Sequence, residues 1–230
     1  MKQPQKISPF LLDALLTMSG GFMDAYSYLY RNHVFANAQT GNILLLGVSL
    51  SEQDYTKALH YFCPVIAFFI GIIISNMIHY NYKNQFQLRW KQIALLVEAV
   101  LLLMVCFIPQ TYNLIANSMI SMACGIQVEC FRKIHNLPIA TTMCIGDLRS
   151  GTQSLCRYFF EHDKEHLKHA FLYYGIILLF VIGAVIGSII IEYLQSAAIA
   201  VSTVLLLVVF ILMFLKMKMN CQTNFQFFPV

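Results

Sequence analysis

The chain has 230 residues, of which 58% are hydrophobic and 11% are charged, and its formal net charge is +4 at pH 7. A soluble domain normally carries about 25% charged residues, so this composition excludes an ordinary soluble fold and indicates a protein of the lipid bilayer. We therefore expect lipid, and not nucleic acid, as its main surroundings.

Six apolar runs follow one another along the chain, each close to the roughly 20 residues that cross a bilayer about 30 Å thick. They are residues 9–30, 61–80, 93–108, 114–131, 170–191 and 197–215. Two shorter runs, residues 43–50 and the weaker 141–155, lie between them. The sequence predicts an all-α integral membrane protein, a single membrane domain over residues 1–230, with about six transmembrane helices and two short re-entrant or half helices.

The positions of the basic residues predict the orientation. If the six long runs cross and the two short ones do not, every Lys and Arg except Arg31 and Lys57 lies on one side. Basic residues near helix ends favour the cytoplasmic side. We therefore expect both termini in the cytoplasm, with residues 216–230 as a cytoplasmic tail. Eight crossings would place several of the basic residues outside.

The two halves of the chain resemble each other. Residues 20–24, followed by Thr40-Gly41-Asn42, recur 105 residues later as residues 125–129, followed by Ile145-Gly146-Asp147. Residues 68–75 and 180–187 also match. Three crossings per copy is an odd number, so the second copy must be inserted upside down. The sequence predicts inverted repeats over residues 9–108 and 114–215, an arrangement that many transporters share.

Both copies of the 68–75 segment carry small residues four positions apart, namely Gly71 and Ser75 in the first and Gly183 and Gly187 in the second. Small residues at this spacing let helix backbones approach closely in lipid. We predict that these four residues pack helices together. Glycine is also common in membrane helices in general, which is the alternative explanation.

Each short run opens with residue types that cap helices or bind polar groups. In the first these are Asn37, Thr40, Gly41 and Asn42, and in the second Thr141, Gly146 and Asp147. A half-helix that begins inside the membrane directs the positive end of its dipole at whatever lies there. We expect the two half-helices to meet and form a solute site. Ordinary capped helices at the membrane surface are the alternative.

Asp24 and Glu129 are acidic residues within apolar helices, where a carboxylate costs roughly 2.5–3.5 kcal/mol on insertion scales. One explanation is a site that binds a proton or cation, with Gln127 as a further contact. The other is a structural role in which these groups join helices; Arg149 closely follows Asp147 and would be a partner of that kind.

The usual catalytic and metal-binding motifs are missing from the sequence. The seven cysteines show no C-x-x-C spacing, and there is no Walker loop, H-E-x-x-H helix or G-x-S-x-G elbow. We therefore expect no metal, no cofactor and no enzymatic activity.

The motifs of both halves resemble the YoaK-like family of bacterial inner-membrane proteins, a domain of unknown function. The resemblance rests on residues 21–25, Val34-Phe35 and Thr40-Gly41-Asn42, and on residues 125–127, 140–142 and 146–149. It implies an integral inner-membrane protein with about six helices and without an established substrate. The second half departs from the family pattern at Val128-Glu129 and at Ile145.

Together these features favour a small secondary transporter or permease for an unidentified solute, with proton coupling and a midplane site between the repeats. Two alternatives remain. A channel also uses re-entrant half-helices, and a membrane accessory or assembly protein would use the glycine-rich faces to bind another helix. The bundle is small, which favours a homodimer.

Overall fold

The computed structural model describes residues 9–82, 87–131 and 142–225, and within these ranges it contains helices and no strands. The prediction of an all-α protein is confirmed. The helices are α1 (Pro9–Tyr30), α2 (Gln39–Ser51), α3 (Tyr55–Tyr82), α4 (Gln87–Val105), α5 (Asn113–Cys130), α6 (Cys144–Glu161), α7 (Lys164–Leu194) and α8 (Ala200–Phe225). Short 3-10 helices at Gln110–Tyr112 and Gln195–Ile199 precede α5 and α8.

Each apolar run predicted from the sequence overlaps a helix; the first run matches α1 in both bounds, and the bounds of the other helices differ. The first short run extends to Gln39–Ser51, and the second begins at Cys144 and continues to Glu161. Helix α8 continues to Phe225, into the segment that we expect to be a tail. Two helical stretches of the described chain, Tyr55–Tyr82 and Lys164–Lys216, are long and apolar enough to cross a membrane by length and composition. The count of six crossings stays a prediction.

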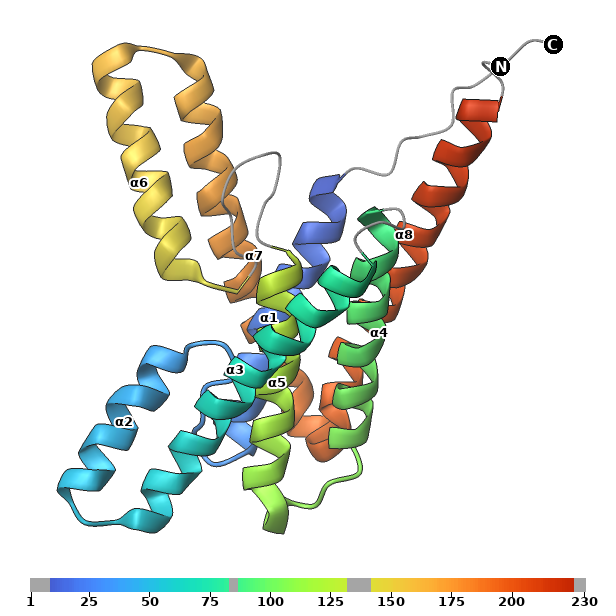
Figure 1. Ribbon diagram of the computed structural model, residues 1–230. Coiled ribbons are helices and arrows are strands. Elements are labelled where there is room, and N and C mark those ends of the chain that lie inside the picture. Colours follow the sequence, from blue (N-terminus) through green and yellow to red (C-terminus); the bar gives the residue numbers. More distant parts are fainter. Residues whose placement is uncertain (1–8, 83–86, 132–141, 226–230) are drawn as a thin grey trace.

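The helices form an elongated bundle from which two hairpins diverge (Figure 1). One hairpin is α2 with the first part of α3, and the other is α6 with the first part of α7. Helices α2 and α6 both begin near the centre of the bundle and run toward opposite ends of it. Helix α1 begins, and helix α8 ends, at the same end of the bundle.

The first helix of each half packs against the third helix of the other half. Helix α1 packs mainly on α7, and α5 packs mainly on α3. At each crossing, glycines lie so close to a facing main-chain carbonyl that an added methyl group would overlap the oxygen. The pairs are Gly21 with Phe180, Gly183 with Met18, Gly125 with Phe68 and Gly71 with Met122. The two crossings therefore use equivalent residues of the two halves.

These contacts change the alignment of the two halves by one residue. Gly125 occupies the place of Gly21, and not that of Gly20 as in the alignment drawn from the sequence. Asp24 consequently corresponds to Val128, and Glu129 is not its counterpart. The alignment of residues 68–75 with 180–187 is unchanged, because Phe68 and Phe180 make the same contact.

All four residues predicted to pack helices lie at these crossings. Besides Gly71 and Gly183, Gly187 lies against Phe22, where an added Cβ would be 3.2 Å from its Cα atom. Ser75 is buried, and its Oγ is 3.1 Å from the Cys130 Sγ.

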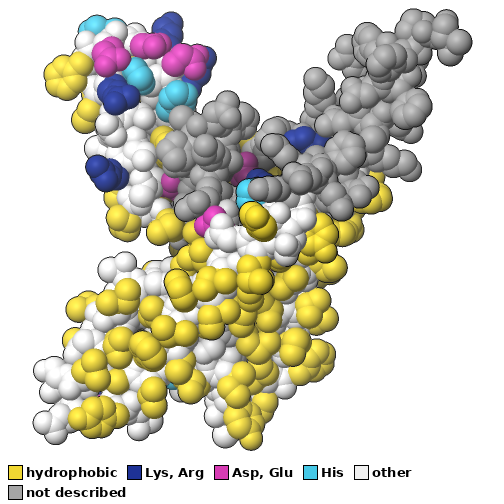
Figure 2. Space-filling view, viewed as in Figure 1, with side chains coloured by type: hydrophobic (Ala, Val, Ile, Leu, Met, Phe, Trp, Pro, Cys, Tyr) yellow, Lys and Arg dark blue, Asp and Glu magenta, His cyan; other side chains and the backbone are white. Residues whose placement is uncertain are grey.

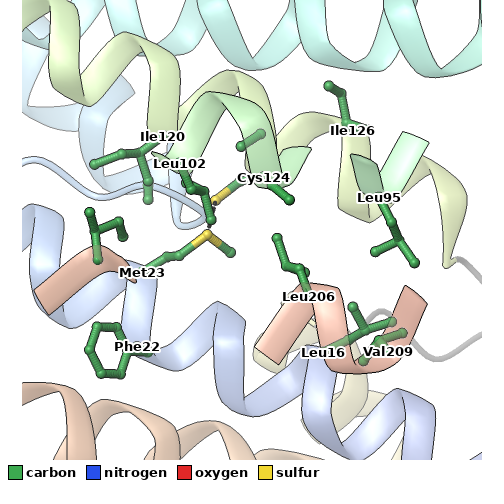
Figure 3. Packing of buried hydrophobic residues seen from close by; sticks show 14 of the residues in the cluster. Leu16, Phe22, Met23, Leu95, Leu102, Ile120, Cys124, Ile126, Leu206 and Val209 are labelled. Atoms are coloured by element: carbon green, nitrogen blue, oxygen red, sulfur yellow. Dashed lines mark hydrogen bonds between the residues drawn. The ribbon is translucent and has the colours of Figure 1, made fainter. Parts of the chain in front are cut away.

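The main hydrophobic core lies between α1, α4, α5 and α8. Its side chains include Leu16, Phe22, Met23, Leu95, Leu102, Ile120, Cys124, Ile126, Leu206 and Val209 (Figure 3). Outside the core, apolar side chains cover much of the visible lower body, while charged groups gather at the far end of the α6–α7 hairpin (Figure 2). An apolar outer surface of this extent is what lipid contact requires.

Candidate functional site

A cavity of about 400 Å³ lies where the two hairpins diverge. Its lining comes from α1, from the first residues of α2 and α6 and the two residues before each of them, and from the middle of α3 and α7. The lining residues are Asp24, Asn37, Ala38, Gln39, Thr40, Phe68, Thr142, Met143, Cys144, Ile145, Gly146 and Phe180. The structure thus brings the beginnings of the two short helices together beside Asp24.

Asp24 is half-buried in α1 and holds the connection between α1 and α2. Its Oδ1 accepts a hydrogen bond from the main-chain N–H of Asn37, at 2.8 Å. The Asn37 side chain is 6% exposed, and its Nδ2 donates to the Gly20 carbonyl at 3.1 Å. The Asn37 Oδ1 is buried and has no hydrogen-bond partner among the described residues. The α1 side of the cavity therefore carries the Asp24 carboxylate, with an unpartnered amide oxygen buried near it.

Asn42 is fully buried and does not line the cavity. Its side chain accepts a hydrogen bond from the Phe35 N–H at 3.1 Å, and donates to the Phe35 carbonyl at 2.7 Å and to the Gln39 Oε1 at 2.9 Å. Asn42 therefore fixes the chain that leads into α2. Gly41 lies against the Phe35 ring, where an added Cβ would be 2.7 Å from Cδ2. Of the first-half residues predicted for the site, Asn37 and Thr40 join Asp24 in the lining.

The second half contributes Thr142 and Gly146 to the lining. Thr142 is 5% exposed, and its Oγ1 has no hydrogen-bond partner among the described residues. Its methyl group lies against Gly20, where an added Cβ would be 2.6 Å away. Asp147 is buried in the first turn of α6, outside the lining, and Arg149 is exposed. Thr141, also predicted for the site, lies outside the described residues.

Both short helices begin at the cavity without a side-chain cap. The residue before α2 is Ala38 and the residue before α6 is Met143, and neither makes a capping hydrogen bond from its side chain. The first turns of a helix leave main-chain N–H groups without intrahelical partners, and the helix dipole adds partial positive charge there. The cavity therefore combines the beginnings of two helices with one carboxylate in its lining, and Asp147 lies buried in the first turn of α6 outside that lining.

Gln127 and Glu129 lie elsewhere. Gln127 is buried on α5, and its Nε2 donates to the Leu16 carbonyl of α1 at 2.9 Å. Glu129 is half-buried near the end of α5 and does not line the cavity. The structure thus assigns Gln127 to the contact between α1 and α5.

Sequence reasoning missed a fully buried Arg31. Its guanidinium donates to the Tyr26 hydroxyl, to the Asn113 Oδ1 at 3.1 Å, and to the carbonyls of Val105 and Ile108 at 3.2 and 2.8 Å. Arg31 therefore caps the carbonyl end of α4 and joins α1 to α5. In the sequence Arg31 is an exception to the charge pattern, and its contacts could not be predicted because a sequence does not show which carbonyls a guanidinium can reach.

Glu98 was missed as well. It is fully buried in α4, and neither carboxyl oxygen has a hydrogen-bond partner among the described residues. A signal was available, since Glu98 lies within the predicted span 93–108 and carries the same insertion cost as Asp24. Phe68 and Phe180, which line the cavity at equivalent positions of the two halves, were predicted to lie in matching segments but not to form part of a site.

Comparisons with known proteins place the chain among membrane proteins. Residues 12–212 match the family described as "Protein of unknown function (DUF1275)". The chain is 29% identical over 182 residues to the UPF0700 transmembrane protein YoaK of Bacillus subtilis (strain 168), covering 75% of this chain and 80% of the relative. No solved structure matches. The resemblance to YoaK-like proteins is therefore confirmed, and the chain is a membrane protein.

Proposed function

The chain belongs to the family of proteins of unknown function DUF1275, and we propose that it is a small secondary transporter or permease whose solute binds in the cavity beside Asp24. One observation carries this proposal. Two short helices, one from each half of the chain, begin at the same cavity together with a carboxylate from α1. Discontinuous helices that begin beside a polar site at the centre of a bundle are typical of secondary transporters.

In the proposed membrane arrangement α1, α3, α4, α5, α7 and α8 cross, while α2 and α6 are half-helices. Two features support it. Helix α1 begins and α8 ends at the same end of the bundle, as six crossings require (Figure 1). The glycine contacts of α1 with α7 repeat in those of α5 with α3, as inverted repeats require. The charge pattern places the termini in the cytoplasm, and the family resemblance favours the bacterial inner membrane.

The proposed transport step is a rocking of two helix groups against each other. One group is α1, α6 and α7, in which α7 packs on both other helices. The other is α2, α3 and α5, in which α3 packs on both other helices. The cavity has lining residues from both groups, with Asp24 and Phe180 from the first and Thr40 and Phe68 from the second. A movement between the groups would open the cavity toward one side and close it toward the other.

Asp24 is the proposed site of proton or cation coupling. It is half-buried, and it joins the cavity to the chain that leads into α2 through the Asn37 N–H. A change in its charge would alter both the solute site and the hydrogen bond that holds this connection. Asp147 and Glu129, the other carboxylates considered for this role, do not line the cavity.

Thermal-shift measurements on the purified protein test the proposal. Metabolites and ions are screened at several pH values against the wild type and Asp24→Asn. A solute that binds only the folded state stabilises it by about 2.7 kcal/mol at one hundred times its dissociation constant. We expect one solute class to stabilise the wild type, with the shift lost in Asp24→Asn. If no solute stabilises the wild type, the accessory role is favoured instead.

A flux experiment distinguishes a channel from a secondary transporter. Once a stabilising solute is known, it is loaded into proteoliposomes with an imposed proton gradient. Accumulation of the solute against its own gradient supports a transporter, whereas equilibration without accumulation supports a channel.

A further inference from the structure

The cavity is negatively charged when Asp24 is ionised. Asp24 is the acidic side chain in its lining, and among the described lining residues there is no Lys or Arg. Close to Asp24, the Asn37 Oδ1 is buried behind the lining, without a hydrogen-bond partner among the described residues, and a rotation of this side chain would bring it to a bound solute. A carboxylate with a neighbouring amide oxygen suits an ammonium group, which has three N–H donors and no acceptor.

The same cavity carries hydrogen-bond donors on its α6 side. The first main-chain hydrogen bonds of α6 are donated by Gly146 and Asp147 to the Met143 carbonyl. The N–H groups of Cys144 and Ile145 precede these bonds, at the start of the helix. Beside them the Thr142 hydroxyl, 5% exposed, has no hydrogen-bond partner in the described part of the chain. Helix N-termini with a free hydroxyl suit a carboxylate.

The remaining lining is apolar. Phe68 and Phe180 contribute aromatic rings from equivalent positions of the two halves, and Met143 and Ile145 add aliphatic surface. The volume of about 400 Å³ lies near the lower limit of the range for small-molecule sites. An apolar group of moderate size therefore fits together with two charged ends.

From these features we infer that the solute is a small zwitterion that carries an ammonium group, a carboxylate and an apolar side chain. The inference rests on the proposed function of the cavity. A simple cation would leave the first N–H groups of α6 and the Thr142 hydroxyl without a partner. A simple anion would meet the charge of Asp24 with no described basic side chain to balance it. A zwitterion satisfies both sides of the cavity.

Three probes that share one apolar group test this inference on the full-length protein. They are L-phenylalanine, its amine counterpart phenethylamine and its acid counterpart 3-phenylpropanoate, and binding is measured by titration calorimetry in detergent. A hydrogen bond to a charged group contributes enough for roughly a tenfold to hundredfold change in affinity. We expect L-phenylalanine to bind at least tenfold more tightly than either counterpart.

Two cavity variants and one control show which residue binds the ammonium group of the probe and which binds its carboxylate. Asp24→Asn is expected to weaken binding of L-phenylalanine and phenethylamine at least tenfold, and to strengthen binding of 3-phenylpropanoate because it removes a like charge from the cavity. Thr142→Val is expected to weaken binding of the two carboxylates and to leave the amine unchanged. Glu129→Gln changes a carboxylate outside the cavity lining and is expected to change none of the three affinities.

The zwitterion proposal is overturned if phenethylamine or 3-phenylpropanoate binds as tightly as L-phenylalanine, which would identify a cation or an anion site. It is also overturned if none of the three probes binds. Neither result would contradict the proposal that the cavity is a solute site. That proposal is tested separately by the reactivity of Cys144, a measurement that needs no ligand.

Discussion

The Asp24 Oδ1 accepts a hydrogen bond from the main-chain N–H of Asn37 at 2.8 Å, which ties the middle of α1 to the chain that leads into α2. The two residues also share the lining of the cavity. Asp24 therefore has a structural function and a position suited to solute binding at the same time, and the two can be separated by mutation.

Asp24→Asn and Asp24→Ala are expected to differ in stability. Asparagine keeps an oxygen acceptor for the Asn37 N–H, whereas alanine removes it. A hydrogen bond to a charged group contributes about 1.5–3 kcal/mol, so Asp24→Ala should lower the free energy of unfolding by about that amount. Thermal or denaturant unfolding in detergent measures the difference. Equal stability of Asp24→Ala and the wild type would show that this hydrogen bond does not hold the connection.

Two glycines of α7 provide a matched test of the helix crossings. A methyl group at Gly183 would overlap the Met18 carbonyl, so Gly183→Ala should separate α7 from α1 and destabilise the protein by about 1–3 kcal/mol. A methyl group at Gly175 meets nothing within 4 Å, so Gly175→Ala should be neutral or stabilise the helix by up to about 1 kcal/mol. Melting temperatures of the two variants give the comparison, and similar values would contradict this packing.

Arg31→Lys should destabilise the fold although the charge is kept. The guanidinium donates to the Tyr26 hydroxyl, to Asn113 and to the two carbonyls near the end of α4, a set that one ammonium group cannot reach. Each buried acceptor left without a partner costs about 1–3 kcal/mol. The free energy of unfolding is therefore expected to fall by at least about 2 kcal/mol. A Lys variant as stable as the wild type would contradict this role.

Glu98→Leu is expected to stabilise the protein. The carboxyl group is fully buried in α4 and has no hydrogen-bond partner among the described residues, so its removal relieves a desolvation cost of about 1–3 kcal/mol. Glu192→Leu, at an exposed position of α7, serves as the control and should change stability by less than about 0.5 kcal/mol. If Glu98→Leu lowers the melting temperature, Glu98 has a partner that stabilises it.

The sequence predicted the helical fold and the approach of the two short helices to each other at their beginnings. Both predictions rest on patterns that are visible within short segments. Apolar runs of membrane length show helices directly. The repeated glycines and the polar residues before each short run indicated which segments approach one another. Asp24, Asn37, Thr40, Thr142 and Gly146 all line the cavity, and four of these five were among the predicted site residues. The fifth, Thr142, follows the predicted Thr141.

Other features depend on contacts between distant segments and could not be predicted. The alignment of the two halves was off by one residue at Gly125, because the loops differ in length and only the facing carbonyls fix the equivalence. Asn42 is a residue type suited to solute contacts, but its side chain bonds to Gln39 of the same helix and to Phe35 just before it. The reach of the Arg31 side chain to the end of α4 is likewise set by the packing of α1.

Access of water to the cavity is the most direct test of the central claim, and Cys144 provides the probe. Cys144 is half-buried and lines the cavity. A variant that retains Cys144 as its only cysteine is placed in sealed vesicles and treated with a charged thiol reagent from each side in turn. The reagent needs a thiolate, which forms in water and not in lipid or in a dry core.

Two further single-cysteine variants calibrate the result. One retains Cys156, which is exposed, and should react from one side; the other retains Cys124, which is fully buried, and should not react. We expect Cys144 to react with reagent from either side, since the cavity opens to each side in turn. If Cys144 stays as unreactive as Cys124 from both sides, the cavity is closed to water and the solute site proposed here is wrong.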